Sequence, residues 1–206
     1  LQVIPSLGYG GAETGCYDLA HFLTERGCKS YIATSKGELL QYVNKKKVKV
    51  FRLPVQSKNP VLILLNAIII SFIILIYNIN IVHARSRAPA WSCFLATKFT
   101  LRKFVTTFHG TYNFNNKIKK FYNSAMVRSD LVIAGSNFIF SHISENYGEF
   151  FLEQKRKLLV IYRGINTDYF NPRNVSKPKI DFFVKEWKIN RDNFIILMPG
   201  RLTNWK

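Results

Sequence analysis

Cysteine is scarce in this chain, and its three cysteines lack the spacing of a metal site or a disulfide framework. Cys16, Cys28 and Cys93 are odd in number, and none belongs to a Cys-x-x-Cys pair. This pattern excludes the usual structural zinc site and a disulfide-stapled fold. No signal peptide is visible either. A reducing compartment fits these features best, so we predict a cytoplasmic protein.

Acidic residues are also few. The chain has 12 Asp and Glu against 30 Lys and Arg, which gives a formal net charge of +18. Such an excess favours a polyanionic partner or an anionic membrane. The cations are dispersed, with one pure triplet at Lys45, Lys46 and Lys47, and no nucleic-acid recognition motif accompanies them. We therefore expect no nucleic-acid partner.

The most apolar stretch of the sequence is too short for a membrane span. Residues 61–76 are apolar except for Asn66 and Ser71. As a helix that rises about 1.5 Å per residue, this stretch covers about 24 Å, less than a hydrocarbon core of about 30 Å. It predicts a helix packed on a sheet. The alternative is peripheral contact with an anionic membrane, on the inner face of the plasma membrane.

Short β-branched or aromatic runs alternate with helical stretches along the chain. This alternation predicts an α/β fold, with a Rossmann-like, doubly wound and mostly parallel sheet. Ligands of such sheets bind at the carboxyl ends of the strands. The predicted strands are 1–5, 30–34, 48–53, 80–84, 103–108, 130–134 and 157–162, and the predicted helices are 12–23, 60–77, 89–98, 117–128 and 137–147.

The pattern changes after residue 165. Residues 166–192 carry scattered charge and prolines, and residues 193–198 resemble a new strand that ends in Pro199 and Gly200. We predict a first Rossmann-like domain over residues 1–165, an interdomain linker over 166–192, and the start of a second domain over 193–206. The sequence opens without Met and stops soon after this strand, so we expect a fragment of a longer protein.

A glycine-rich turn lies between the first predicted strand and the first predicted helix. It reads Gly8-Tyr9-Gly10-Gly11-Ala12-Glu13, and glycine suits tight turning and close backbone approach. Backbone N–H groups at Gly10 and Gly11 and the helix N-terminus can hold a phosphate. Glu13 stands where a dinucleotide fingerprint needs glycine, and the motif of a P-loop is absent. A simple tight turn is the alternative reading.

Three further polar motifs follow predicted strands. His109 comes directly after the strand 103–108 and precedes Gly110, so its imidazole is expected in the same crevice as the glycine turn. Arg85 and Arg87 follow the strand 80–84, where guanidinium groups can bind an anionic or polyhydroxylated substrate; a solvated basic loop is the alternative. Ser136 either caps the next helix, the favoured reading, or contacts a ligand.

Two cations come last in the sequence. Arg201 and Lys206 follow the strand-like run 193–198. A leaving diphosphate develops negative charge, and fixed cations stabilise it. On their own these two residues do not indicate a diphosphate site.

Taken in order, the motifs resemble glycosyltransferase family 4. The resemblance rests on 3–13, His109 with its neighbours, 160–166 with Asp168 and Phe170, and 200–206. Where the family often shows Asn-Gly-Val-Asp, this chain has Arg163-Gly164-Ile165-Asn166, which leaves the role of Arg163 open. The resemblance implies a bacterial enzyme of the GT-B fold, in which two Rossmann-like domains face each other across a cleft.

Site roles follow from the same resemblance. Gly10 and Gly11 would lie against the donor diphosphate, His109 would contact the transferred sugar, and Arg201 and Lys206 would neutralise the leaving nucleoside diphosphate. Strand-end position places Arg85 and Arg87 toward the acceptor. The family's glutamate pair, which holds the donor, would lie beyond residue 206, so the fragment alone is expected to be inactive.

The implied reaction is hexosyltransferase-like. A nucleotide-diphosphate sugar would donate its sugar, with retained configuration and without a metal or other cofactor, to a cell-envelope glycan or lipid-linked acceptor. Two other classes remain open from the sequence: a noncatalytic module that binds anionic glycan or lipid, and a Rossmann-type sugar-nucleotide epimerase or dehydrogenase. An inverting transferase is a further alternative, which would need a base near the acceptor hydroxyl.

Overall fold

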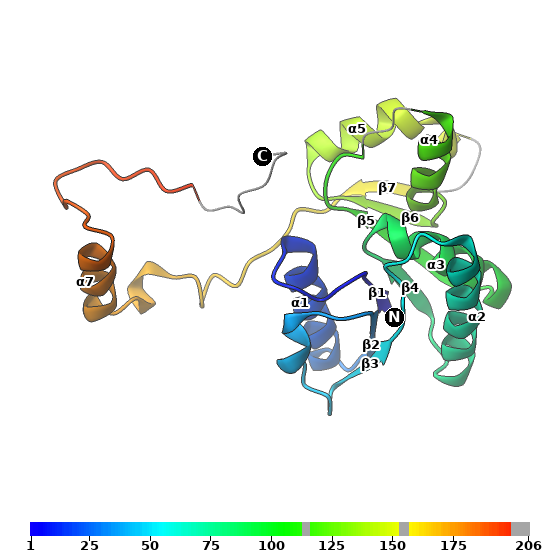
Figure 1. Cartoon of the computed structure of the whole chain (residues 1–206), viewed down its shortest axis with the longest axis horizontal. Coiled ribbons are helices and arrows are strands. Elements are labelled where there is room, and N and C mark those ends of the chain that lie inside the picture. Colours follow the sequence, from blue (N-terminus) through cyan, green and yellow to red (C-terminus); the bar gives the residue numbers. More distant parts are fainter. Residues whose placement is uncertain (113–115, 153–156, 199–206) are drawn as a thin grey trace. The chain divides into compact units, whose positions relative to one another are not determined.

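The computed structural model describes residues 1–112, 116–152 and 157–198, and it divides the chain into two units (Figure 1). The first unit is Leu1–Arg163 and the second is Gly164–Lys206. The first unit contains the whole sheet and nearly all of the helices.

The first unit is built on a seven-stranded sheet in which every neighbouring pair is parallel. The strand order is β3-β2-β1-β4-β5-β6-β7, so the direction of winding reverses between β1 and β4. The predicted doubly wound α/β fold is confirmed. The strands are β1 Gln2–Val3, β2 Ser30–Thr34, β3 Val48–Arg52, β4 Ile81–Ala84, β5 Lys103–Phe108, β6 Leu131–Ala134 and β7 Lys157–Val160.

Side chains alternate between the two faces of the sheet, as the pleat requires. Val3 is buried in one apolar cluster, whereas the next residue, Ile4, is buried in another. Ala33 and Ile32 of β2 divide between the same two clusters. The first cluster packs beneath helices that follow β3, β4 and β6, and the second lies beneath the helix that follows β1. Helices therefore cover both faces.

The helices of the first unit begin and end at recognisable signals. α1 has Gly10 as its extended N-cap, and Gly27, with a φ of 77°, follows its end in the left-handed region that glycine tolerates. α5 begins at the capping residue Ser136. The helices are α1 Gly11–Glu25, α2 Pro60–Ile76, α3 Arg87–Thr100, α4 Lys117–Asn123, α5 Asn137–Tyr147 and α6 Glu149–Leu152, with short 3-10 turns η1 Glu38–Gln41 and η2 Ser124–Val127.

The apolar helix α2 packs on the sheet through one side only. Asn59 caps its first turn by accepting a hydrogen bond from Val61 N–H, and Pro60 occupies the first turn without needing a donor. Ile70 and Ile74 of this helix are fully buried. The predicted helix is confirmed, with its end one residue earlier than expected. Among the described residues, no helix has both the length and the apolarity for a bilayer crossing.

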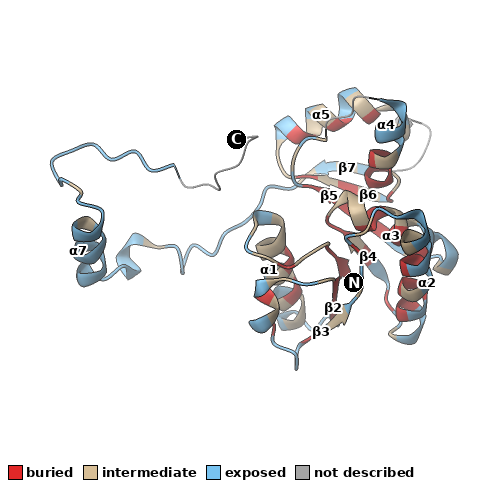
Figure 2. Ribbon diagram, viewed as in Figure 1, coloured by how far each residue is buried: buried red, intermediate tan, exposed pale blue. Residues whose placement is uncertain are grey.

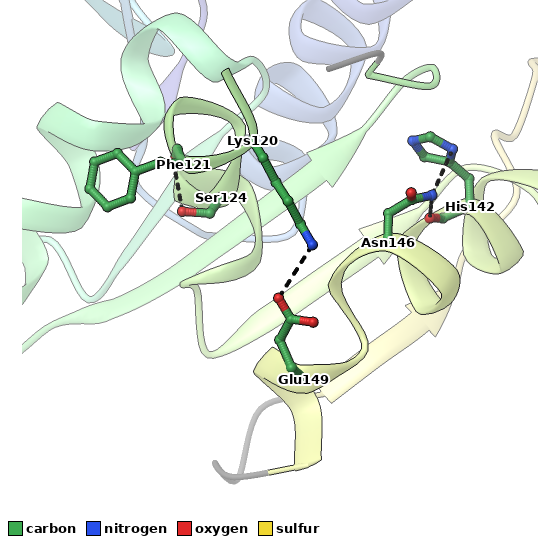
Figure 3. Close-up of polar contacts among 6 residues, drawn as sticks. All are labelled: Lys120, Phe121, Ser124, His142, Asn146 and Glu149. Atoms are coloured by element: carbon green, nitrogen blue, oxygen red, sulfur yellow. Dashed lines mark hydrogen bonds and ion pairs between the residues drawn. The ribbon is translucent and has the colours of Figure 1, made fainter. Parts of the chain in front are cut away.

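The helix predicted over 117–128 is wrong in its second half. α4 stops at Asn123, and the chain tightens into η2, where the Ser124 hydroxyl donates to the carbonyl oxygen of Phe121 at 2.7 Å. A serine hydroxyl bonded to a nearby carbonyl competes with regular helix geometry. An ion pair, Lys120 Nζ to Glu149 Oε1 at 3.5 Å, connects α4 to α6 (Figure 3).

The described part of the second unit, residues 164–198, contains a 3-10 turn, η3 Pro172–Asn174, and one helix, α7 Lys177–Glu186. The segment predicted as a linker thus includes a helix of ten residues. The strand predicted over 193–198 is not formed, and Phe194 is fully exposed. A strand is held by hydrogen bonds to a neighbouring strand, and none of the described residues pairs with this segment.

Candidate functional site

An open pocket of about 260 Å³ lies at the carboxyl ends of β1, β4 and β5. These three strands are neighbours in the sheet, and the winding reverses between the first two. Open α/β sheets bind their ligands at this kind of reversal. The lining residues come from the segments after the three strands and from the first turn of α1: Ile4, Pro5, Ser6, Ala12, Glu13, Arg85, Ser86, His109, Gly110 and Tyr112.

The first turn of α1 reaches this pocket through Ala12 and Glu13, whereas Gly10 and Gly11 are not among its lining residues. Gly10 has no side chain with which to cap the helix, so the first-turn N–H groups have no cap from the N-cap residue. A Cβ at Gly10 would collide with the Glu13 carboxylate, and one at Gly11 would lie 2.8 Å from Arg163 Nη1. Both glycines therefore permit a close approach of other groups. The helix N-terminus itself favours a negative charge.

Arg85 is a buried cation on the wall of the pocket. Its Nη1 donates to Gln2 Oε1 at 2.7 Å, and Gln2 Nε2 in turn donates to the carbonyl oxygen of Cys16 at 3.0 Å. Arg85 Nε is buried without a hydrogen-bond partner. Burial lowers the pKa of Arg85, and the nearby positive charge of Arg163 lowers it further. No carboxylate among the described residues forms an ion pair with it.

Arg163 adds a second guanidinium beside the glycine turn. It donates to the carbonyl oxygen of Gly11 and to Thr14 Oγ1. A Cβ at Gly15 would lie 3.1 Å from Arg85 Nη2 and 3.5 Å from Arg163 Cζ, so both guanidinium groups lie against this turn of α1. Two positive charges, the Glu13 carboxylate and a helix N-terminus thus share one small region, whose side chains carry a net positive charge. Such a region attracts an anion.

His109 faces the same pocket as the glycine turn, as the sequence predicts. The walls of the pocket displace water and lower the pKa of His109 to about 4, and the charges of Arg85 and Arg163 contribute to the shift. The residue as a whole keeps an exposed surface, so this is the desolvation of an open pocket and not of the core. At neutral pH the imidazole is uncharged, so one ring nitrogen can donate a hydrogen bond and the other can accept one.

Tyr112 is a pocket residue that the sequence did not indicate. Its ring packs on Phe108, with centroids 4.8 Å apart. Its backbone N–H donates to His142 Nε2 at 3.3 Å. Asn146 Nδ2 in turn donates to the carbonyl oxygen of His142 at 2.8 Å (Figure 3). Helix α5 therefore positions this wall of the pocket. The one feature of the sequence that could have indicated Tyr112 as a pocket residue is its position three residues after His109.

The structure separates the two arginines that the sequence placed together. Arg85 lines the pocket, whereas Arg87 begins α3, donates to Asn123 Oδ1 at 3.1 Å and lies 4.4 Å from the centroid of the Tyr112 ring. Ser136 caps α5 by accepting from Ile139 N–H at 3.3 Å. The remaining two predicted residues, Arg201 and Lys206, lie outside the described residues.

Comparison with known proteins gives consistent matches. The family model of Glycosyltransferase Family 4 matches residues 9–169. A glycosyltransferase from Rickettsia africae ESF-5 is 41% identical, with a TM-score of 0.81 over 100% of this chain and 54% of its own. Anabaena HepE, in complex with UDP-glucose, is 17% identical with a TM-score of 0.75 over 100% and 53%. The galactosyltransferase WaaB of the lipopolysaccharide outer core is 14% identical, with a TM-score of 0.55 over 81% and 46%.

The chain spans about half the length of the structures that it resembles. A search among curated proteins found no match.

Proposed function

The chain belongs to Glycosyltransferase Family 4, and from that premise we propose that the whole protein transfers a sugar from a nucleotide-diphosphate sugar to a cell-envelope glycan or lipid-linked acceptor. The configuration at the anomeric carbon is retained in this proposal. One observation carries it: the buried Arg85, which has no carboxylate partner among the described residues, meets the helix N-terminus of the glycine turn at one pocket.

The diphosphate of the donor is proposed to lie against Gly10 and Gly11. A buried cation without a counterion is costly, and a bound anion removes that cost. The first-turn N–H groups of α1 supply fixed donors, and Arg163 adds positive charge beside the same turn. These groups gain most when charge develops on the leaving diphosphate, because fixed donors and cations then stabilise the transition state.

The transferred sugar is proposed to contact His109. An imidazole with a pKa of about 4 is neutral at physiological pH, so it can hold a sugar hydroxyl by a hydrogen bond without carrying a charge. A cation at this position would compete with the sugar for the diphosphate. The neutral state therefore suits a residue that orients the sugar while the arginines bind the phosphates.

The acceptor is proposed to enter on the side of Arg85, where a phosphate of a lipid-linked acceptor could also bind. Arg87 would act there through Tyr112, whose ring it contacts. Arg201 and Lys206, whose positions are not described, are proposed to neutralise the leaving group. No metal or other cofactor enters this proposal. The pocket, at about 260 Å³, is at the small end for a ligand site, as expected if a second domain supplies the remaining contacts.

The test is a transfer assay on the whole protein with a panel of UDP-, GDP- and ADP-sugars and a bacterial lipid extract as acceptor. The expected result is release of one nucleoside diphosphate and a product whose anomeric configuration, determined by NMR, matches that of the donor. An inverted product would overturn the retaining mechanism. Absence of nucleoside diphosphate release with every donor would overturn sugar transfer itself.

A further inference from the structure

The outer side of α2 is apolar along its whole length. Its inner side is buried against the sheet and α3, and a soluble helix normally places polar residues on the opposite side. Here the opposite side carries exposed apolar residues at intervals of three and four, which is one helical stripe. Figure 2 marks exposed parts of α2 in pale blue. The stripe comprises Val61, Leu64, Leu65, Ile68, Phe72, Leu75 and Ile76.

Helix α3 extends this surface. It packs alongside α2, where Ser92 Oγ donates to the carbonyl oxygen of Ile63 at 3.0 Å. It adds Leu95, Phe99 and Leu101, which are all exposed. We call the stripe on α2 together with these three residues the α2–α3 apolar face.

Leu101 is the most unusual member of the α2–α3 apolar face. It ends α3 with a φ of 54°, in the left-handed region where glycine is the common residue, and its side chain is 90% exposed. A leucine here neither relaxes the backbone nor fills the core. Its exposed apolar side chain is available for a contact outside the fold. Large exposed apolar surfaces mark interaction sites.

The stretch of sequence that contains the α2–α3 apolar face has no acidic residue. From Leu39 to Ser129 the sequence contains 15 Lys and Arg and no Asp or Glu. Lys58 lies just before α2, and Lys98 is exposed on α3. At the other end Arg102 Nη2 donates to Asn78 Oδ1 at 3.0 Å, which places a guanidinium where both helices finish. The partner of this face is therefore expected to combine an apolar interior with negative charge.

We infer that the α2–α3 apolar face docks in the plane of an anionic lipid bilayer. The exposed stripe enters the boundary between headgroups and acyl chains, while Lys58, Lys98 and Arg102 bind lipid phosphates. Because the inner side of α2 is buried in the domain, the helix lies flat and does not cross. A second copy of the chain is a poorer partner, since it would bring the cations Lys58, Lys98 and Arg102 of two copies together.

The sharpest test compares two identical substitutions on the purified whole protein. Phe72→Glu places a carboxylate in the centre of the stripe, where Phe72 is 60% exposed. Phe22→Glu is the matched control, since Phe22 is 49% exposed on α1, outside the face. Both change the net charge equally, and neither removes a buried side chain. Binding is measured by sedimentation with vesicles of phosphatidylcholine and phosphatidylglycerol, and with vesicles of phosphatidylcholine alone.

The expected result is binding to the anionic vesicles that Phe72→Glu weakens about tenfold or more and that Phe22→Glu leaves within about twofold. Pure phosphatidylcholine vesicles should bind more weakly, and added salt should release the protein. Equal binding of the two variants, or absence of wild-type binding, would overturn the inference. So would a wild-type dimer in analytical ultracentrifugation that Phe72→Glu dissociates. Vesicle binding involves no sugar transfer, so either proposal can fail without the other.

Discussion

The guanidinium group of Arg163 donates a hydrogen bond to the carbonyl oxygen of Gly11, although 152 residues separate them in the sequence. Its other terminal nitrogen donates to Thr14 Oγ1 on the next turn of α1. Arg163, which lies shortly after β7, therefore holds the glycine turn that follows β1. This contact gives Arg163 a role that the sequence left open, because it fixes the backbone of the proposed diphosphate site and adds a positive charge to it.

Replacing Arg163 should weaken nucleotide binding more than it weakens the fold. We expect Arg163→Ala to raise the dissociation constant of the nucleoside diphosphate about tenfold, since a charge-assisted contact is worth about 1.5 kcal/mol. Isothermal titration calorimetry measures the effect. Arg173→Ala, an exposed arginine of the second unit, is the control. Equal affinities of the two variants would remove Arg163 from the site.

His109 should affect turnover more than folding, because it faces the pocket with an exposed surface. We expect His109→Ala to lower kcat at least about tenfold in the whole protein, as for other lost contacts to a reacting substrate. His109→Asn, which can still hydrogen-bond a hydroxyl, should recover part of the rate. Steady-state transfer rates give the answer, and unchanged turnover of the alanine variant would exclude a contact with the sugar.

The strand histidine His83 should make the fold sensitive to acid. Burial lowers the pKa of His83 to about 3, with Arg85 and His109 contributing, against about 6.5 in the unfolded chain. Between these pKa values only the unfolded state binds the proton. Neutral His83 therefore does not lower the free energy of unfolding above about pH 6.5, and this free energy falls as the pH decreases below that value. The loss between about pH 6.5 and 4 is at most about 3 kcal/mol.

Urea unfolding as a function of pH tests this sensitivity. His83→Gln removes the titrating group and can still hydrogen-bond Thr107 Oγ1, which His83 Nε2 contacts at 2.8 Å. Its unfolding free energy should therefore vary less over that range than that of the wild type. His21→Gln on α1 serves as the comparison. A wild-type profile that stays flat down to pH 4 would contradict the assignment.

The two sides of α2 should differ sharply in their effect on stability. Ile70 is fully buried and Ile68 is 48% exposed. We expect Ile70→Ala to lower the free energy of unfolding by about 2–5 kcal/mol through lost contacts and a cavity, and Ile68→Ala to change it by less than about 1 kcal/mol. Urea unfolding curves provide both values. A large loss for Ile68→Ala would mean that this side of the helix is covered.

Local sequence patterns predicted the strands and helices whose residues clearly favour one type of secondary structure. Lys103–Phe108 is a run of β-branched and aromatic residues and is a strand at the expected bounds. The placement of His109 beside the glycine turn followed from the rule that parallel strands end at one edge. Residues 193–198 have the same β-branched character, yet they form no strand, because pairing depends on a neighbour that the pattern does not contain.

The sequence did not predict the directions in which the site side chains point. Arg85 and Arg87 stand two residues apart, yet the first is buried against Gln2 and the second is drawn to Asn123 and Tyr112. These partners come from distant parts of the chain. The return of Arg163 to Gly11 depends on the path of the chain after β7, which no local periodicity records. Contacts of this kind become visible only in the folded structure.

The most direct test of the site is a crystal structure of the whole protein with the nucleotide sugar that binds it best. The account predicts that diphosphate oxygens lie within hydrogen-bond distance of the amides of Gly10 and Gly11, with a phosphate near Arg85 and the sugar against His109. A nucleotide sugar bound at the amino ends of the strands, or one that leaves the glycine turn without a phosphate contact, would contradict it.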